Sequence, residues 1–141
     1  MEASVTWLQA MAFEAEADGH RFNIDANSEA GGHDLGPRPK TLLLSSLAGC
    51  TAMDVISILQ KMRLNVTGLQ VTADGVVTDE HPRRFTRIVL RYAVTGQDLP
   101  PERVRRAVEL SQERYCGVSA TLRPGVELVS EIVLNGQPLE G

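Results

Sequence analysis

The chain has 141 residues, of which 43% are hydrophobic and 23% charged, a composition typical of a soluble globular protein and not of a disordered one. Its 18 acidic residues against 14 Lys and Arg give a formal net charge of -4, and only 4% of residues are aromatic. These values exclude the basic patches and stacking surfaces typical of nucleic-acid binding, and a surface attracted to anionic membrane. The length predicts a single domain over residues 1–141.

The N-terminal stretch MEASVTW lacks the basic region and the apolar run of a signal peptide. The most apolar window, residues 42–59, contains several hydroxyl groups and one acid, which a buried helix tolerates better than a membrane span does. We therefore expect a cytoplasmic protein that neither enters nor binds membranes.

Short strands are predicted first, over 4–9, 13–17 and 21–26, followed by a loop over 27–39 that is dense in Gly, Asp and Pro. Pro39 suits the first turn of a helix, and the apolar positions of residues 39–62 nearly surround that helix. We expect it to be the central, largely buried helix of the fold.

The second half of the chain alternates strands and helices. Residues 65–79 and 83–96 predict an antiparallel strand pair, in which alternate residues from Thr86 to Val94 face the core and Arg87 and Arg91 face water. An amphipathic helix follows over 100–115, with a stripe of Val104, Ala107, Val108 and Ser111, and then a short helical turn over 116–122 and a strand over 125–136. This order predicts an α+β domain.

Two cysteines, Cys50 and Cys116, are the residues most able to carry chemistry. A structural disulfide is not expected in a reducing compartment, and no metal-type spacing joins the cysteines to a histidine, so we expect no metal and no other cofactor. Cys50 lies beside Ala48 and Gly49, so its sulfur either packs as a small hydrophobic group or remains open to an approaching ligand.

Two acid–base questions stay open at this point. Asp54 lies one helical turn after Cys50, where it would either oppose a thiolate or form an ion pair with an arginine. Cys116 lies at the joint before residues 117–122, where it is either a plain linker residue or a thiol favoured by a helix N-terminus and by nearby Arg114.

The segments LAGCTAMDVISILQKM and ELSQERYCGVSATL, together with the Gly36 to Pro39 entry into the long helix, resemble the OsmC/Ohr family of osmotically inducible and organic hydroperoxide resistance proteins, and most closely its YhfA-like branch. The resemblance implies an OsmC-like fold of antiparallel sheets around a long central helix, assembled as an intertwined homodimer. It also implies an oxidoreductase of the stress response, an antioxidant peroxidase with redox-active cysteines.

In that family the first cysteine attacks the peroxide and the second resolves the product to a disulfide, which a dithiol reductant, often lipoyl-linked, reduces. The resemblance therefore assigns these roles to Cys50 and Cys116. Active members also place a Glu and an Arg near the thiol, but here Lys40 stands at the Glu position and the expected turn holds no Arg. Arg21, Arg38 or Arg114 remains as a substitute, with Asp54 as the acid that orients it.

Two functions follow. The first is reduction of hydroperoxides through Cys50 and Cys116. The second is a dimeric binding module whose apolar pocket holds a small hydrophobic or thiol-reactive molecule with little turnover. The two cysteines favour the first function, and the missing activating pair favours the second.

Overall fold

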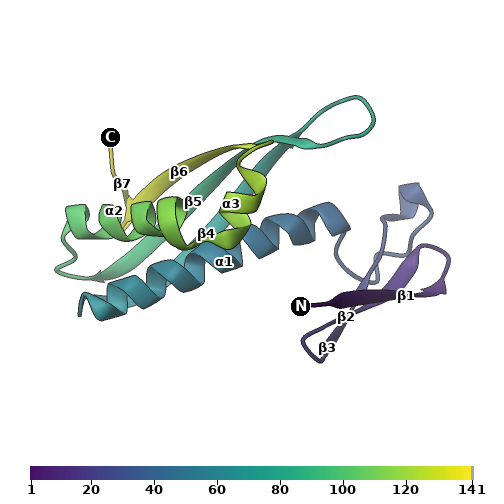
Figure 1. Ribbon diagram of the computed structural model, residues 1–141, viewed down its shortest axis with the longest axis horizontal. Coiled ribbons are helices and arrows are strands. Elements are labelled where there is room, and N and C mark those ends of the chain that lie inside the picture. The colour runs from purple at the N-terminus through teal and green to yellow at the C-terminus, as the bar shows by residue number, and fades with distance from the viewer. Residues whose placement is uncertain (141) are drawn as a thin grey trace. The chain divides into compact units, whose positions relative to one another are not determined.

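The computed structural model describes residues 1–140 and divides into two compact units, Met1–Leu43 and the remainder from Leu44 (Figure 1). In the first unit, β1 (Ala3–Gln9), β2 (Ala12–Ala17) and β3 (His20–Ile24) form an antiparallel sheet in that order. The second turn is a tight pair, Asp18 and Gly19, with positive φ values of 52° and 79°, as hairpin turns between twisted strands require. The three predicted strands are thus confirmed.

The predicted loop between β3 and the long helix is built around a buried carboxylate. Asp25 is 3% exposed and accepts hydrogen bonds from the backbone N–H groups of Ala26, His33 and Leu35, at 2.7, 3.1 and 3.2 Å. Burial by itself would raise the pKa of Asp25, but these bonds lower it below its ordinary value. A short 3₁₀ turn, η1 (Ser28–Ala30), was not predicted.

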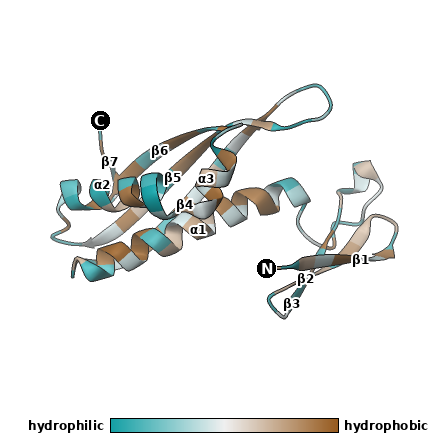
Figure 2. Ribbon diagram, viewed as in Figure 1, coloured by the Kyte–Doolittle hydropathy of each residue, from teal (hydrophilic) through white to brown (hydrophobic). Residues whose placement is uncertain are grey.

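The long helix α1 (Pro39–Lys61) has the start that Pro39 predicts. Its fully buried residues follow one stripe at four-residue intervals: Leu47, Thr51, Val55 and Leu59. The expectation of a largely buried helix is therefore wrong for a single chain, since Met53 is 73% exposed. Figure 2 shows hydrophobic residues recurring along α1, and the helix is long and apolar enough to cross a membrane by length and composition alone. Its buried stripe instead packs into the protein core.

The second unit contains a four-stranded sheet in the order β4 (Asn65–Val77), β5 (Phe85–Gln97), β6 (Glu127–Leu134) and β7 (Gln137–Pro138). The pairing of β4 with β5 is antiparallel, as predicted. The pairing of β5 with β6 is parallel and was not predicted, nor was β7. The crossover between β5 and β6 consists of α2 (Pro101–Leu110), the π-turn η2 (Ser111–Tyr115) and α3 (Gly117–Leu122) (Figure 1).

The core lies on the face of this sheet that carries the helices. Ile88, Leu90, Tyr92 and Val94 of β5 are fully buried and belong to one cluster with the buried stripe of α1 and with Val104, Ala107 and Val108 of α2. The intervening Arg91 is exposed, so the predicted two-faced strand is confirmed. Because α1 and α2 share this face, residues separated by about sixty positions in the chain meet between them.

Candidate functional site

The two cysteines meet in the second unit. The Sγ atoms of Cys50 and Cys116 and a carboxylate oxygen of Asp54 all lie within 4.8 Å of one another. Both thiols are free; Cys50 is partly exposed, whereas Cys116 is only 3% exposed. The two predicted cysteines are therefore neighbours in space, and only Cys50 is open to a molecule arriving from solvent.

Local structure explains this meeting. Cys50 and Asp54 are one turn apart on α1 and so share a helix face. On the other side, α2 gives way to the π-turn Ser111–Tyr115, and Cys116 then leaves the helical conformation and becomes the N-cap of α3. A π-turn inserts an extra residue into the helical repeat and is frequent at functional sites. Here it places Cys116 at the end of the turn, with its backbone N–H donating to the Ser111 carbonyl at 2.8 Å.

The surroundings of Cys116 disfavour its charged form. Burial raises the pKa of the Cys116 thiol, and the neighbouring Cys50 raises it further, while the Ser119 hydroxyl and backbone N–H lower it. The Ser119 N–H lies 3.4 Å from the sulfur. The net shift is upward, which favours the plain linker residue over a thiol stabilised by the helix N-terminus; α3 has only six residues.

Asp54 is held by a hydroxyl and not by a cation. Its Oδ2 accepts a hydrogen bond from Ser111 Oγ at 2.9 Å, and within residues 1–140 it forms no ion pair. Of the two alternatives that the sequence left open for Asp54, the ion pair with an arginine is thus absent, and the residue that faces Asp54 from η2 is Ser111. No arginine is oriented by this carboxylate.

Beneath the thiols lies a buried network of hydroxyl groups. Thr51 Oγ1 is 2.7 Å from Ser111 Oγ and 2.8 Å from the Tyr92 hydroxyl. The Gln112 side-chain amide donates to Thr51 Oγ1 and to Tyr92 at 3.1 and 3.2 Å. Burial raises the pKa of Tyr92, so it stays a neutral donor and acceptor. This network ties α1, β5 and η2 together directly behind Asp54.

The other predicted residues have different surroundings. Arg38 pairs with Asp34 and also donates to the Gly36 carbonyl at 3.1 Å, and both Arg38 and Lys40 belong to the N-terminal unit. Arg114 is exposed on η2 and forms no ion pair within residues 1–140. Arg21 lies 3.9 and 3.7 Å from Glu14 and Glu16 on the first sheet. No described contact brings an arginine to either sulfur.

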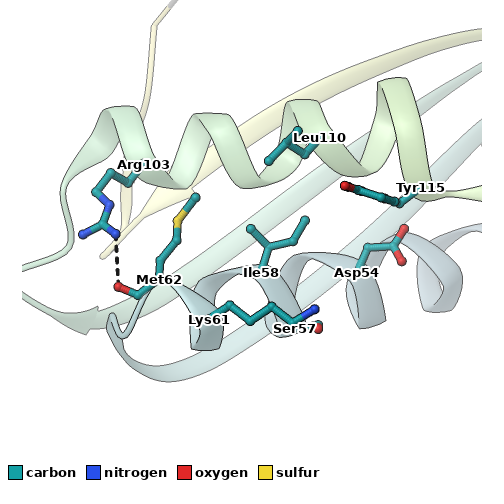
Figure 3. A pocket seen from close by; sticks show the side chains of 8 residues that line it. All are labelled: Asp54, Ser57, Ile58, Lys61, Met62, Arg103, Leu110 and Tyr115. Carbon is teal, nitrogen blue, oxygen red and sulfur yellow. Dashed lines mark hydrogen bonds between the residues drawn. The ribbon is translucent and has the colours of Figure 1, made fainter.

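A groove of about 610 Å³ lies between α1 and α2, and of the three site residues only Asp54 lines it (Figure 3). Asp54 lies toward one end of the groove, and apolar side chains line its middle. Lys61 and Arg103 lie farther along, where Arg103 donates to the Met62 carbonyl at 3.1 Å. The groove is lined by Asp54, Ser57, Ile58, Lys61, Met62, Arg103, Leu110 and Tyr115.

Sequence reasoning missed the hydroxyl network and Ser119. Thr51 lies in the same buried stripe as Leu47 and Val55, and a polar residue at such a position signals a buried hydrogen bond. Ser111 was placed on the buried stripe of the amphipathic helix, which is confirmed, but its partner Asp54 was not recognised.

Comparison with known proteins identifies the family of this chain. The OsmC family, described as OsmC-like protein, matches residues 31–131. This chain belongs to the OsmC family. It is 41% identical over 129 residues to Protein YhfA of Escherichia coli K12, covering 91% of this chain and 93% of that protein. The predicted family and its YhfA-like branch are therefore confirmed.

Solved structures show the same fold. A hypothetical protein from Aquifex aeolicus VF5 is similar with a TM-score of 0.80 and 25% identity, covering 95% of this chain and 96% of that one. An organic hydroperoxide resistance protein from Elizabethkingia anophelis has a TM-score of 0.73 and 17% identity, with 94% of each chain covered. At 17% identity the likeness shows the fold alone, and it confirms the α+β, OsmC-like class.

Proposed function

We propose that this protein reduces hydroperoxides through Cys50 and Cys116. The observation that carries the proposal is the pair of free thiols within 4.8 Å, one open to solvent and one buried. A buried partner thiol next to an accessible one is suited to capture an oxidised sulfur before it reacts further. Membership of a family whose structural neighbours include named hydroperoxide resistance proteins supports the same reaction.

The reaction balances with these two residues and a dithiol. The Cys50 thiolate attacks one peroxide oxygen, so that an S–O bond forms, the O–O bond breaks and the alcohol leaves with a proton. The Cys116 thiolate then attacks the Cys50 sulfenic acid, forming a disulfide and releasing water. A dithiol reductant, such as a lipoyl-linked one, returns both cysteines to thiols by thiol–disulfide exchange.

Charge around the site sets the expected rate. A carboxylate oxygen of Asp54 lies within 4.8 Å of both sulfurs, and none of the described ion pairs brings a cation to it. The raised pKa of Cys116 keeps most of that thiol protonated at neutral pH. We therefore expect slow turnover that rises with pH, since each unit of pKa above the ambient pH lowers the thiolate population about tenfold.

The groove favours a second candidate, binding of a small hydrophobic or thiol-reactive molecule without efficient turnover. Ile58, Leu110 and Tyr115 offer an apolar wall next to Asp54, in a volume within the range of small-molecule sites. Because the Asp54 carboxylate lies within 4.8 Å of the Cys50 sulfur, a hydroperoxide bound in the groove next to Asp54 would lie near that thiol, so the groove fits both functions. Catalytic turnover of a hydroperoxide distinguishes the two functions.

The deciding experiment follows consumption of an organic hydroperoxide by the reduced protein, with dithiothreitol or a lipoyl donor. We expect turnover in the native chain, none in Cys50→Ser, and in Cys116→Ser a single oxidation that stops at sulfenic or sulfinic acid. A non-reducing peptide map should join Cys50 to Cys116 after one equivalent of peroxide. Free thiols after that treatment, with ligand binding intact, would reject the peroxidase and leave the binding module.

We further propose a homodimer, a single OsmC-like domain and a cytoplasmic location. Only 22% of the most apolar window of α1 is buried within one chain, so a second copy would cover the remaining surface. Trp7 is 63% exposed and so lies outside the core of this chain. The free thiols fit a reducing compartment.

A further inference from the structure

The three atoms that meet at the site are all metal ligands. Two are thiol sulfurs, from Cys50 and Cys116, and the third is a carboxylate oxygen of Asp54. We propose that they bind one divalent ion of the zinc type, with the remaining coordination position left to solvent. The sequence predicted no metal because only histidines were considered as additional ligands; the fold supplies Asp54 instead.

Distances support this assignment. Zinc binds thiolate sulfur at about 2.3 Å and carboxylate oxygen at about 2.0–2.2 Å in a tetrahedral arrangement, which separates neighbouring donor atoms by about 3.4–3.8 Å. The observed upper limit is 4.8 Å for every pair. Cys50 and Asp54 are both partly exposed, so their side chains keep rotational freedom with which to approach an ion.

Charge supports it as well. Metal binding would turn two thiols into thiolates beside a carboxylate, and the charge of the ion would offset their mutual repulsion. Within residues 1–140, Asp54 has no Lys, Arg or His partner. A divalent ion would supply the positive charge that the side chains around this cluster do not.

The surrounding polar groups are arranged as partners of metal ligands. Ser111 Oγ holds Oδ2 of Asp54 at 2.9 Å, which leaves Oδ1 free to coordinate. The Ser119 N–H donates to Cys116 Sγ at 3.4 Å. Ser119 Oγ is completely buried beside that sulfur and has no hydrogen-bond acceptor in the described chain, so it stands ready to donate to a fully charged thiolate. Such outer contacts orient ligands and strengthen binding.

The donor set also selects the metal. Two sulfurs and one oxygen suit zinc and its spectroscopic substitute cobalt, whereas magnesium and calcium require oxygen ligands alone. Binding releases the thiol protons to solvent and involves no electron transfer.

The test titrates the reduced full-length protein with Co²⁺ alone, without air. We expect a thiolate-to-cobalt charge-transfer band and the visible bands of tetrahedral cobalt, saturating at one ion per chain and displaced by Zn²⁺. Cys50→Ser and Cys116→Ser should each remove about half of the charge-transfer intensity, because each removes one sulfur ligand. Asp54→Asn should keep both sulfurs but weaken affinity at least about tenfold.

Asp74→Asn is the matched control, because Asp74 is an exposed acid on β4 of the same unit, and it should bind cobalt as the native chain does. Circular dichroism verifies that each variant is folded. Absence of the charge-transfer band, or a band unchanged in both serine variants, would overturn the proposal. Neither result bears on hydroperoxide turnover measured with a chelator, so failure of this site and failure of the peroxidase are distinguishable.

Discussion

The buried hydroxyl network makes Thr51 the most informative position for a stability test. Thr51 is fully buried on α1, and its hydroxyl contacts Ser111, Tyr92 and Gln112 at 2.7, 2.8 and 3.1 Å. Thr51→Val keeps the shape of the side chain and removes only this hydroxyl. The variant therefore tests the network and not the packing.

The expected loss of unfolding free energy depends on which hydrogen bonds the partners of Thr51 keep. Ser111 keeps its bond to Asp54, and Tyr92 keeps the Gln112 amide, so neither group loses every partner. Leaving buried polar groups short of a partner costs about 1–3 kcal/mol, and we expect about 2 kcal/mol of lost unfolding free energy for Thr51→Val. Tyr92→Phe should cost about 1 kcal/mol, because Thr51 keeps two of its three partners.

The assay is equilibrium unfolding in urea, followed by far-ultraviolet circular dichroism, of both single variants and the double variant. Replacing both partners with apolar groups of similar shape leaves little unsatisfied, so the double variant should lose about 0.5–2 kcal/mol less than the sum of the single losses. Losses that add within about 0.5 kcal/mol would refute the coupling of α1 to β5 through this hydroxyl pair.

Three further predictions follow from single residues. The pKa of Asp25 is lower in the folded protein than its ordinary value of 3.8, so its contribution to stability is complete above pH 3.8 and is lost as pH falls through the folded pKa. Asp25→Asn should loosen the 25–38 loop at pH 7 and abolish this loss of stability in acid. Limited proteolysis at several pH values would show both effects. Ser119→Ala should slow alkylation of Cys116, because the Ser119 hydroxyl lowers the pKa of that thiol; faster alkylation would contradict this account. Met53→Arg should convert a dimer to monomers in light scattering, whereas a monomeric native protein at micromolar concentration would remove the proposed dimer.

Much of the fold was predictable because its strands and helices carry regular patterns. Alternation in residues 85–94 identified the inward face of β5, and the spacing of Val104, Ala107, Val108 and Ser111 identified the inward face of α2. Pro39 marked the start of α1. These patterns depend only on neighbouring residues in the chain, so they can be read without knowing which elements pack against one another.

What the sequence did not reveal depends on tertiary geometry. The parallel pairing of β5 with β6 follows from a crossover through α2 and α3, and nothing in the residues of β6 distinguishes a parallel from an antiparallel neighbour. The π-turn over Ser111–Tyr115 continues the helical pattern of α2 and has no residue signature of its own. The pattern of α1 predicted a buried helix, but a single chain can cover only one stripe of it.

The surroundings of Asp54 are the part of the site that the sequence left open, because residue types alone do not say which side chain faces a carboxylate. An arginine partner and the absence of one were both possible, and the π-turn brings Ser111 to that carboxylate. The π-turn that brings Ser111 to Asp54 therefore bears on both proposals for this site, peroxide reduction and metal binding. A divalent ion would hold both sulfurs as ligands, so that they cannot form a disulfide while it is bound. Because the two uses require the same sulfur atoms, they exclude each other at any instant, and metal occupancy would limit the fraction of protein able to react with peroxide.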